Sequence, residues 1–280
     1  MDDKTVVITG ANGQVGRALQ KVYPQALALD REQLDITDQK AINEFNWDNV
    51  KVIINAAAWT DVDGAENPSN YSLVKAVNVD ATRYLATSAN QRDLTFVTFS
   101  SDYVFDGSQP IHNEDESFSP LNIYGKTKAD GDLAAATTTK YYIIRTSWVI
   151  GDGRNFVNIM QDLAARGVKP SVVNDQIGRL TFTDTLARGI KHLLETNAPY
   201  GTYNLTNEGQ PASWADIAKI VFEKSGKSPS DVQPVSTAEY FADKPNTAKR
   251  PLQSTLDLTK IEKTGFIPED WRDKLDKLLG

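Results

Sequence analysis

The stretch Thr5-Val-Val-Ile-Thr9-Gly10-Ala-Asn12-Gly13-Gln14-Val15-Gly16 decides the fold of this 280-residue chain. Its first five residues are apolar or β-branched, which predicts a strand buried on both faces of a parallel sheet. Three glycines follow directly, and a helical pattern runs from Val15 to Val22. The three glycines could simply form a tight turn that binds no ligand. In this order, however, strand, turn and helix predict a phosphate-binding site, because the backbone can approach phosphate closely and the helix N-terminus supplies N–H donors.

The segments that follow alternate between strands and helices. Further strands are predicted at Ala26–Leu29, Lys51–Ile54, Leu94–Phe99 and Tyr141–Arg145, with helices over Ser69–Asn90 and Ile123–Ala136. This alternation predicts an α/β fold with a Rossmann-like, doubly wound parallel sheet. We expect a nucleotide-coenzyme domain over residues 1–150, with parts of 170–210 able to return to its sheet. A smaller substrate-binding lobe is expected over residues 151–280.

Residues that follow the predicted strands extend the coenzyme site. Asp30 lies about 20 residues after the first glycine, where this fold places the group that binds the adenosine ribose. An acid there favours NADH, whereas the adjacent Arg31 suits the extra phosphate of NADPH, so both coenzymes stay open. Asp35 could instead begin a turn, and the small residues Ala56–Ala58 could instead allow close packing under the next helix. The predicted coenzyme site comprises Gly10, Asn12, Gly13, Gln14, Val15, Gly16, Asp30, Arg31, Asp35, Ile36, Ala56, Ala57, Ala58, Asn78, Tyr124 and Lys128.

Three residues carry the predicted chemistry. Tyr124 and Lys128 are four positions apart in a predicted helix, so their side chains share a face. A nearby ammonium favours the phenolate and lowers the tyrosine pKa from about 10, which prepares the phenol for proton transfer. Ser101 follows a buried strand, where its hydroxyl can bind an oxygen that gains charge. The Tyr-x-x-x-Lys spacing is common by itself, but with a nucleotide site upstream it predicts carbonyl reduction or the reverse reaction.

Composition and charge exclude several classes of protein. The chain has no cysteine, which excludes disulfides, thiolate catalysis and Cys-ligated metal centres. His112 and His192 are far apart and are predicted to be surface residues, so no metal site is expected. The net charge of −7, without a basic cluster, argues against a nucleic-acid partner. Because neither a signal region nor a long apolar segment is present, we expect no membrane association and a cytoplasmic location.

A series of longer motifs spans nearly the whole chain. The motifs are Gly10-Ala-Asn-Gly-Gln-Val-Gly16, Leu34-Asp-Ile-Thr-Asp38, Asn55-Ala-Ala-Ala-Trp-Thr-Asp-Val-Asp-Gly-Ala-Glu66, Ser101-Asp-Tyr-Val-Phe-Asp-Gly107, Arg145-Thr-Ser-Trp148, Asp175-Gln-Ile-Gly178 and Arg250-Pro-Leu-Gln-Ser254. Together they resemble the dTDP-4-dehydrorhamnose reductase family of the extended short-chain dehydrogenase/reductases. The resemblance implies NAD(P)H-dependent reduction of the 4-keto group of dTDP-4-dehydro-6-deoxy-L-mannose to give dTDP-L-rhamnose, the last step of dTDP-rhamnose synthesis.

The resemblance also implies a role for each site residue. Tyr124 protonates the new alkoxide, Ser101 binds the same oxygen, and Lys128 lowers the tyrosine pKa and binds the nicotinamide ribose. Asp102 and Tyr103 line the sugar pocket. The nucleotide and its diphosphate face Trp148, Gln176, Arg179 and Arg250. Core packing for Trp148 and a surface position for Arg179 are the alternatives.

Three positions depart from the family pattern. Ser101 stands where the family often has threonine, which preserves the hydroxyl. Leu180 replaces a usual proline, which leaves the shape of the substrate loop open. Ala18 replaces an acid that pairs through a bound metal in some members, so we expect a monomer or weak homodimer and not a magnesium-bridged dimer.

Two other functions share this fold. The first is a different nucleotide-sugar enzyme: a 4-ketoreductase of another sugar, a dehydratase or an epimerase. A 4,6-dehydratase typically has two consecutive acids after the hydroxyl residue, whereas here Asp102 is followed by Tyr103. The second is a non-catalytic subunit similar to the regulatory β subunit of methionine adenosyltransferase. The complete set of Ser101, Tyr124 and Lys128 argues against that role.

Overall fold

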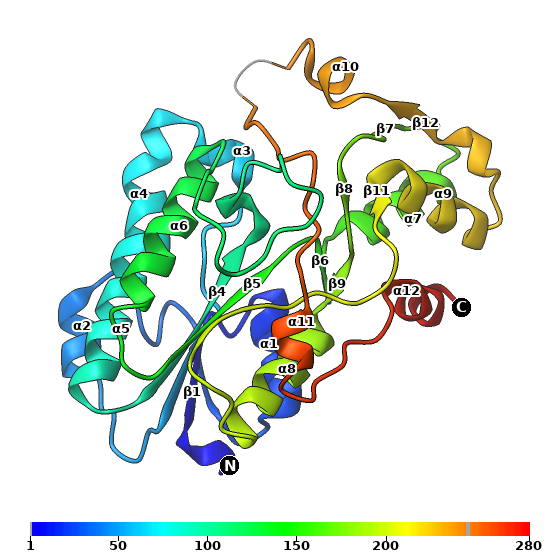
Figure 1. Cartoon of the computed structure of the whole chain (residues 1–280). Helices are drawn as coiled ribbons and strands as arrows, with labels where there is room; N and C mark the ends of the chain where they lie inside the picture. Colours follow the sequence, from blue (N-terminus) through cyan, green and yellow to red (C-terminus); the bar gives the residue numbers. More distant parts are fainter. Residues whose placement is uncertain (1, 245–246) are drawn as a thin grey trace.

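A six-stranded parallel sheet forms the centre of the molecule (Figure 1). The computed structural model describes residues 2–244 and 247–280. The strand order is β10-β5-β4-β3-β1-β2, so the order reverses beside β1, the strand that leads into the glycine turn. The predicted doubly wound fold is confirmed. The strands are β1 (Val6–Thr9), β2 (Leu27–Leu29), β3 (Val52–Asn55), β4 (Thr95–Ser101), β5 (Tyr141–Thr146) and β10 (Gly201–Asn204).

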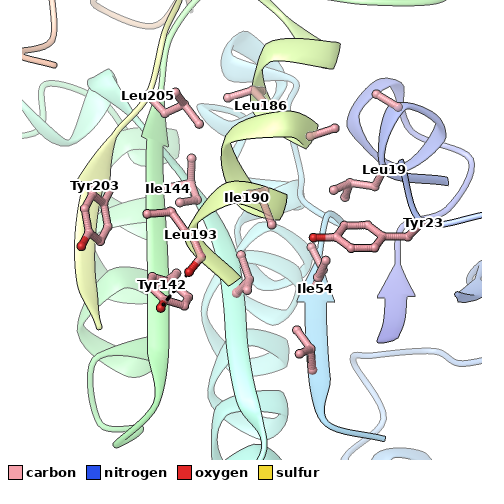
Figure 2. Close-up of a cluster of buried hydrophobic side chains, with 14 of the residues drawn as sticks. Leu19, Tyr23, Ile54, Tyr142, Ile144, Leu186, Ile190, Leu193, Tyr203 and Leu205 are labelled. Carbon is pink, nitrogen blue, oxygen red and sulfur yellow. Dashed lines mark hydrogen bonds between the residues drawn. The ribbon is translucent and has the colours of Figure 1, made fainter. Parts of the chain in front are cut away.

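Helices cover both faces of this sheet because successive apolar side chains of each strand point to opposite sides. Val6 and Ile8 of β1 face one core, while Val7 faces the other. The first core lies under α1 (Gln14–Val22) and α8 (Thr183–Glu195), and Figure 2 shows α8 side chains packed over the strands. The second core lies under α2 (Gln39–Glu44), α5 (Ala81–Gln91) and α6 (Ile123–Ala135).

The helix predicted over Ser69–Asn90 is interrupted in the middle. It consists of α4 (Tyr71–Lys75), a π-helical turn (Ala76–Asp80) and α5, after the short helix α3 (Val62–Ala65) and a 3₁₀ turn (Pro68–Asn70). Asn78 lies in the π turn and is buried. Its side chain accepts a hydrogen bond from the Trp59 amide (2.9 Å) and donates to the Thr127 hydroxyl (3.1 Å). Asn78 therefore joins the loop after β3 to α6.

The remaining elements form a second lobe with its own core. Leu180, Trp271 and the apolar faces of α7 and α9 meet in this core. Its helices are α7 (Phe156–Ala165), α9 (Trp214–Lys224), α10 (Thr237–Phe241) and α12 (Trp271–Leu279). Its short strands pair as β6 (Val149–Ile150) with β9 (Thr181–Phe182), β7 (Ser171–Val173) with β12 (Gln233–Val235), and β8 (Ile177–Gly178) with β11 (Ala212–Ser213).

The chain beyond residue 150 also contributes to the main sheet. β10 pairs in parallel with β5, and α8 packs against α1, where Ala18 is buried. α11 (Thr259–Glu262) joins the same side through the buried Ile261. The two parts of the structure are therefore interleaved in sequence after residue 150.

His112 corrects a prediction from the sequence. It was expected at the surface, but its side chain is fully buried, and its ring stacks on Phe105 at 4.7 Å. Its ring nitrogens lie 2.8 Å from a Glu116 carboxylate oxygen and 3.2 Å from the Gln253 carbonyl. The burial arises because the segment around Leu256 runs beside His112, a tertiary contact that a local pattern does not reveal.

Within the described ranges, no helix combines the length and apolar character that crossing a bilayer would require. The same ranges contain no group of three or more His, Asp or Glu side chains arranged to hold a metal ion.

Candidate active site

A pocket of about 280 Å³ opens at the carboxyl ends of β1, β2 and β3. Nine of the sixteen predicted coenzyme-site residues line it: Gly10, Gly13, Asp30, Arg31, Asp35, Ile36, Ala56, Ala57 and Ala58. Leu34, which precedes Asp35 and Ile36 in sequence, also lines it, as do Thr37 and Val77, which were not predicted. Small side chains and backbone form much of the wall, as expected for a surface on which a dinucleotide lies.

Gly10 is required where β1 meets the pocket. Its φ is +71°, and a Cβ there would lie 2.5 Å from the Ala57 nitrogen and 2.6 Å from the Ala56 carbonyl carbon. Both neighbours are backbone atoms and cannot rotate away. Because the turn after β1 and the loop after β3 approach this closely, the backbone has the shape of a phosphate-binding turn. The observed residues therefore fit a nicotinamide dinucleotide.

Hydrogen bonds hold the carboxylate of Asp30, the residue predicted to bind the adenosine ribose. One oxygen of Asp30 accepts from the amides of Glu32 and Gln33, and the other accepts from Asn12 at 3.3 Å. Arg31 pairs with Asp35 at 3.2 Å, but its side chain is 75% exposed. Because so exposed an ion pair contributes little, the Arg31 guanidinium can turn towards a phosphate. Asp35 also takes the alternative turn role, since it accepts from the Thr37 amide.

The other predicted coenzyme residues lie around this pocket. Asn12 contacts Asp30, Gly16 begins the buried side of α1, and Val15 packs against the first core. Gln14 opens α1, and Asn78 holds the adjacent loop through Trp59.

Ser101, Tyr124 and Lys128 meet where β4 ends beside α6. Ser101 and Lys128 are buried, at 7% exposure each, while Tyr124 is half-buried. The Ser101 hydroxyl lies near enough to the Tyr124 phenol to lower its pKa. The Lys128 Nζ donates to the Phe99 carbonyl of β4 at 2.5 Å. The structure thus brings together the hydroxyl, the phenol and the helix that carries the ammonium.

The start of α6 is tied to the segment that carries Arg250. The Asn122 side chain caps the helix by accepting from the Gly125 amide at 2.7 Å, and it donates to the Lys249 carbonyl at 2.7 Å. A Cβ on Gly125 would lie 2.1 Å from the Tyr103 carbonyl oxygen. The absence of a side chain at Gly125 therefore lets the Tyr103 backbone approach, and the Tyr103 ring meets the Tyr124 ring edge-on at 5.7 Å.

The environment of Tyr124 corrects the predicted direction of its pKa. The pKa is raised to about 12, mainly by burial and then by the Asp102 carboxylate, whereas the nearby Ser101 hydroxyl acts to lower it. The predicted net lowering of this pKa is therefore wrong for this structure, in which the Lys128 Nζ hydrogen-bonds the Phe99 carbonyl. A phenol with a pKa of about 12 is fully protonated at neutral pH, the state in which it can donate a proton.

Asp102 has a perturbed pKa as well. It is only 3% exposed and accepts from the Ser101 hydroxyl at 2.9 Å. Burial raises its pKa to about 6, although hydrogen bonds with Ser254 and Ser101 act in the opposite direction. Asp102 is therefore largely ionised at neutral pH, directly beside the hydroxyl of Ser101.

A second pocket, of about 490 Å³, lies between Tyr103 and the second lobe. Three predicted substrate residues line it: Tyr103, Gln176 and Arg250. Its other lining residues were not predicted as site residues: Asp63, Phe156, Met160, Ser171, Val172, Val173, Trp214, Tyr240, Phe241, Lys244 and Thr247. Aromatic walls with cations beside them suit a nucleotide diphosphate.

Arg250 is held in place before any ligand arrives. Its Nη2 pairs with Asp63 at 2.8 Å, its Nη1 donates to the Ala248 carbonyl, and its guanidinium lies 4.8 Å from the centre of the Phe241 ring. Although burial acts to raise it, the pKa of Asp63 is lowered by hydrogen bonds from Arg250 and the Ala248 amide. The sequence predicts a loop over Pro245–Pro251, and its residues 245 and 246 lie outside the described residues.

The remaining predicted substrate residues differ in position. Gln176 is buried and donates to the Thr237 hydroxyl at 3.1 Å. Trp148 stacks on the pocket residue Trp214 at 3.7 Å and packs against the core of the second lobe, with a left-handed φ of +47°. Arg179 does not line the pocket, because its Nη1 points to the Leu256 carbonyl at 3.5 Å. Leu180 is fully buried in the second core.

Comparisons with known proteins agree with this arrangement. The family model described as RmlD substrate binding domain matches residues 4–280. A dTDP-4-dehydrorhamnose reductase of Aggregatibacter actinomycetemcomitans is 38% identical over 98% of this chain and 97% of its own length.

The chain belongs to the dTDP-4-dehydrorhamnose reductase family. Solved structures of the family superpose closely on it. A dTDP-4-dehydrorhamnose reductase from Clostridium acetobutylicum matches with a TM-score of 0.89 and 37% identity, covering 97% of each chain. One from Bacillus anthracis, in complex with NADP, matches with a TM-score of 0.88 and 34% identity, also covering 97% of each chain.

Proposed function

We propose that the protein reduces the 4-keto group of dTDP-4-dehydro-6-deoxy-L-mannose with NADPH or NADH to give dTDP-L-rhamnose. The observation that carries the proposal is the meeting of Ser101 and Tyr124 where β4 ends beside α6, with the Tyr124 ring against Tyr103 of the second pocket. Family membership supports the same reaction.

Each region has one task in this reaction. The pocket at the glycine turn holds the coenzyme, with Asp30 at the adenosine ribose and Gly10 and Gly13 at the phosphates. The bound nicotinamide supplies the hydride. Residues 151–280, apart from the segments that join the main sheet, form the substrate lobe, and Arg250 with Gln176 binds the nucleotide part of the sugar. An arginine suits a diphosphate because its guanidinium can donate two parallel hydrogen bonds.

Proton transfer falls to Tyr124. Its phenol is protonated at neutral pH, so it can deliver a proton to the oxygen that becomes an alkoxide when hydride reaches the carbonyl carbon. The Ser101 hydroxyl stabilises the same oxygen, and the Lys128 ammonium then stabilises the phenolate left behind. Asp102 and Tyr103 contact the sugar.

The proposal includes a cytoplasmic location, since the reaction draws on a pool of reduced coenzyme. It also includes a monomer or weak homodimer. Ala18 supports this state, because it packs inside the first core and offers no ligand for a metal between subunits.

One assay tests the substrate directly. Oxidation of NADPH and of NADH is followed by absorbance with dTDP-4-dehydro-6-deoxy-L-mannose, and separately with UDP- and GDP-linked 4-keto-6-deoxy sugars. We expect the dTDP sugar to be reduced at least 10-fold more efficiently in kcat/KM. Equal efficiency with the other nucleotides would point to a different nucleotide-sugar reductase. A lack of turnover with every sugar, in protein that binds NADPH, would favour the non-catalytic role.

A further inference from the structure

A buried carboxylate lies one helical turn beyond Lys128 on α6. Tyr124, Lys128 and Asp132 follow one another at four-residue steps, so they share one face of the helix. Asp132 is 3% exposed and Lys128 is 7% exposed. The reaction outlined above uses Tyr124 and Lys128 but assigns no task to Asp132.

Arg145 of β5 fixes the position of this carboxylate. Its Nε lies 3.0 Å from Asp132 Oδ2, and its Nη1 donates to the Glu114 carbonyl at 3.0 Å. The guanidinium also lies over two aromatic rings, 5.3 Å from the centre of Phe105 and 5.0 Å from that of Phe118. Because Arg145 is itself only 4% exposed and held on four sides, the carboxylate it binds has little freedom to move.

The sheet register connects this pair to the reacting groups. Arg145 stands opposite Ser100, directly before Ser101 in β4. The buried Ser100 side chain acts to lower the pKa of the Asp132 carboxyl. Asp132 thus belongs to α6 by its own backbone, is paired with β5 through Arg145, and lies near Ser100 of β4. These three elements position the active site.

Charge balance explains why a carboxylate is needed there. Burial lowers the pKa of Lys128, and Asp132 acts in the opposite direction. Burial likewise raises the pKa of Asp132, opposed by Arg145, Ser100 and Lys128. The charged or titratable groups facing this region are Lys128, Tyr124, Asp102 and Arg145. A neutral Asp132 would leave Lys128 and Arg145 as two buried cations without a counter-charge, which is costly.

We propose that Asp132, fixed by Arg145, is a positioning residue of the active site: it keeps the buried Lys128 in its ammonium form, ready to serve Tyr124 and the coenzyme ribose. The role rests on the proposed reductase function. It makes Asp132 an electrostatic partner of the catalytic lysine and not merely part of a structural ion pair.

The first test reads the lysine directly and does not depend on turnover. Protein labelled with ¹⁵N-lysine is titrated by NMR, and the Lys128 Nζ signal is assigned with Lys128→Met. In Asp132→Asn we expect the titration midpoint of Lys128 to fall by about one pH unit or more. Asp130→Asn is the matched control, since it removes the same charge from an exposed position of α6, and its midpoint should equal that of the wild type.

The second test is the pH profile of kcat/KM. Loss of the ammonium removes the group that stabilises the phenolate, so the alkaline limb of Asp132→Asn should move to lower pH by the same amount as the NMR midpoint. Asp132→Glu should restore most of the wild-type profile. A uniform drop in activity without a shift of the limb would indicate a structural role and overturn the proposal.

A third variant addresses the possibility that Asp132→Asn does not fold because Arg145 is left unpaired. Asp132→Asn combined with Arg145→Met removes both charges, a replacement that buried ion pairs often tolerate. We expect the Lys128 midpoint to fall in this folded variant as well. An unchanged midpoint in it would contradict the proposal. If the wild type lacked reductase activity, the proposed function would fail, while the NMR titration would still decide the role of Asp132.

Discussion

The two pockets of this protein are constructed in different ways. The proposed coenzyme pocket is formed mainly by three short segments that each follow a parallel strand, with Val77 of the π turn in addition. The proposed substrate pocket is formed mainly by large side chains from segments far apart in sequence, and its ion pair joins residues 187 positions apart. The shape of the first pocket therefore depends on how closely backbone segments approach one another. The shape of the second depends on which side chains the tertiary fold brings together.

The largest effect is expected where backbones approach most closely. Gly10→Ala should place a Cβ against the backbone of Ala56 and Ala57 and destabilise the fold by at least ~3 kcal/mol, with loss of NADPH binding. Thermal unfolding and NADPH fluorescence titration measure both effects. Gly167→Ala is the matched control, because Gly167 has a φ of +69° but no neighbour within 4 Å of its Cβ position. It should lose only ~1 kcal/mol. Equal losses in the two variants would show that the close approach is unimportant.

The next effect is expected at Asp102, which accepts a hydrogen bond from Ser101. Its folded-state pKa of about 6 exceeds the ordinary value of 3.8, so between these pH values the native protein binds more protons than the unfolded chain. Stability attributable to Asp102 therefore falls as pH rises through this window. Asp102→Asn should gain up to ~3 kcal/mol relative to wild type near pH 7.5 and almost nothing near pH 4.

A neighbouring acid supplies the control for Asp102. The pKa of Asp106 is lowered by hydrogen bonds from Ser108, so Asp106→Asn should lose stability, relative to wild type, as pH rises. Urea unfolding at the two pH values distinguishes these signs. The interpretation of Asp102 would be wrong if its variant had the same offset from wild type at both pH values.

The smallest effect is expected in the pocket that Arg250 lines, which is formed mainly by large side chains. Arg250→Ala should raise KM for the nucleotide sugar by ~10- to 100-fold, the value of a charged hydrogen bond to phosphate, and should leave KM for NADPH within ~2-fold. Asp63→Asn should raise the same KM less, by several-fold, because Arg250 keeps its contacts with Ala248 and Phe241. Steady-state kinetics in both substrates separates these cases. Parallel increases in the two KM values would remove Arg250 from the substrate pocket.

The same difference explains what could be predicted from the sequence. Gly10, Asp30 and Ala56–Ala58 were predicted to lie together because each follows a strand, which is a local property, and they line one pocket. Asp63, Phe241 and Lys244 line the other pocket but were not predicted there, since nothing near them in sequence indicates that Arg250 lies beside them.

Burial caused the other errors. The residue types around Tyr124 indicated a lowered pKa, but desolvation and the Asp102 carboxylate outweigh the nearby cation. His112 and Arg179 are polar residues in loop-like sequence, yet the segment at Leu256 covers the first and accepts a hydrogen bond from the second. Such contacts depend on chain segments that a short pattern does not include.

The central claim is that Tyr124 delivers the proton to the substrate oxygen. Single-turnover oxidation of bound NADPH, after mixing with dTDP-4-dehydro-6-deoxy-L-mannose, measures this step directly in Tyr124→Phe and in the neighbouring variant Tyr103→Phe. We expect Tyr124→Phe to slow the reaction by ~10²- to 10⁴-fold with NADPH affinity unchanged, and Tyr103→Phe to alter mainly the sugar affinity. A Tyr124→Phe rate equal to that of the wild type would contradict the account.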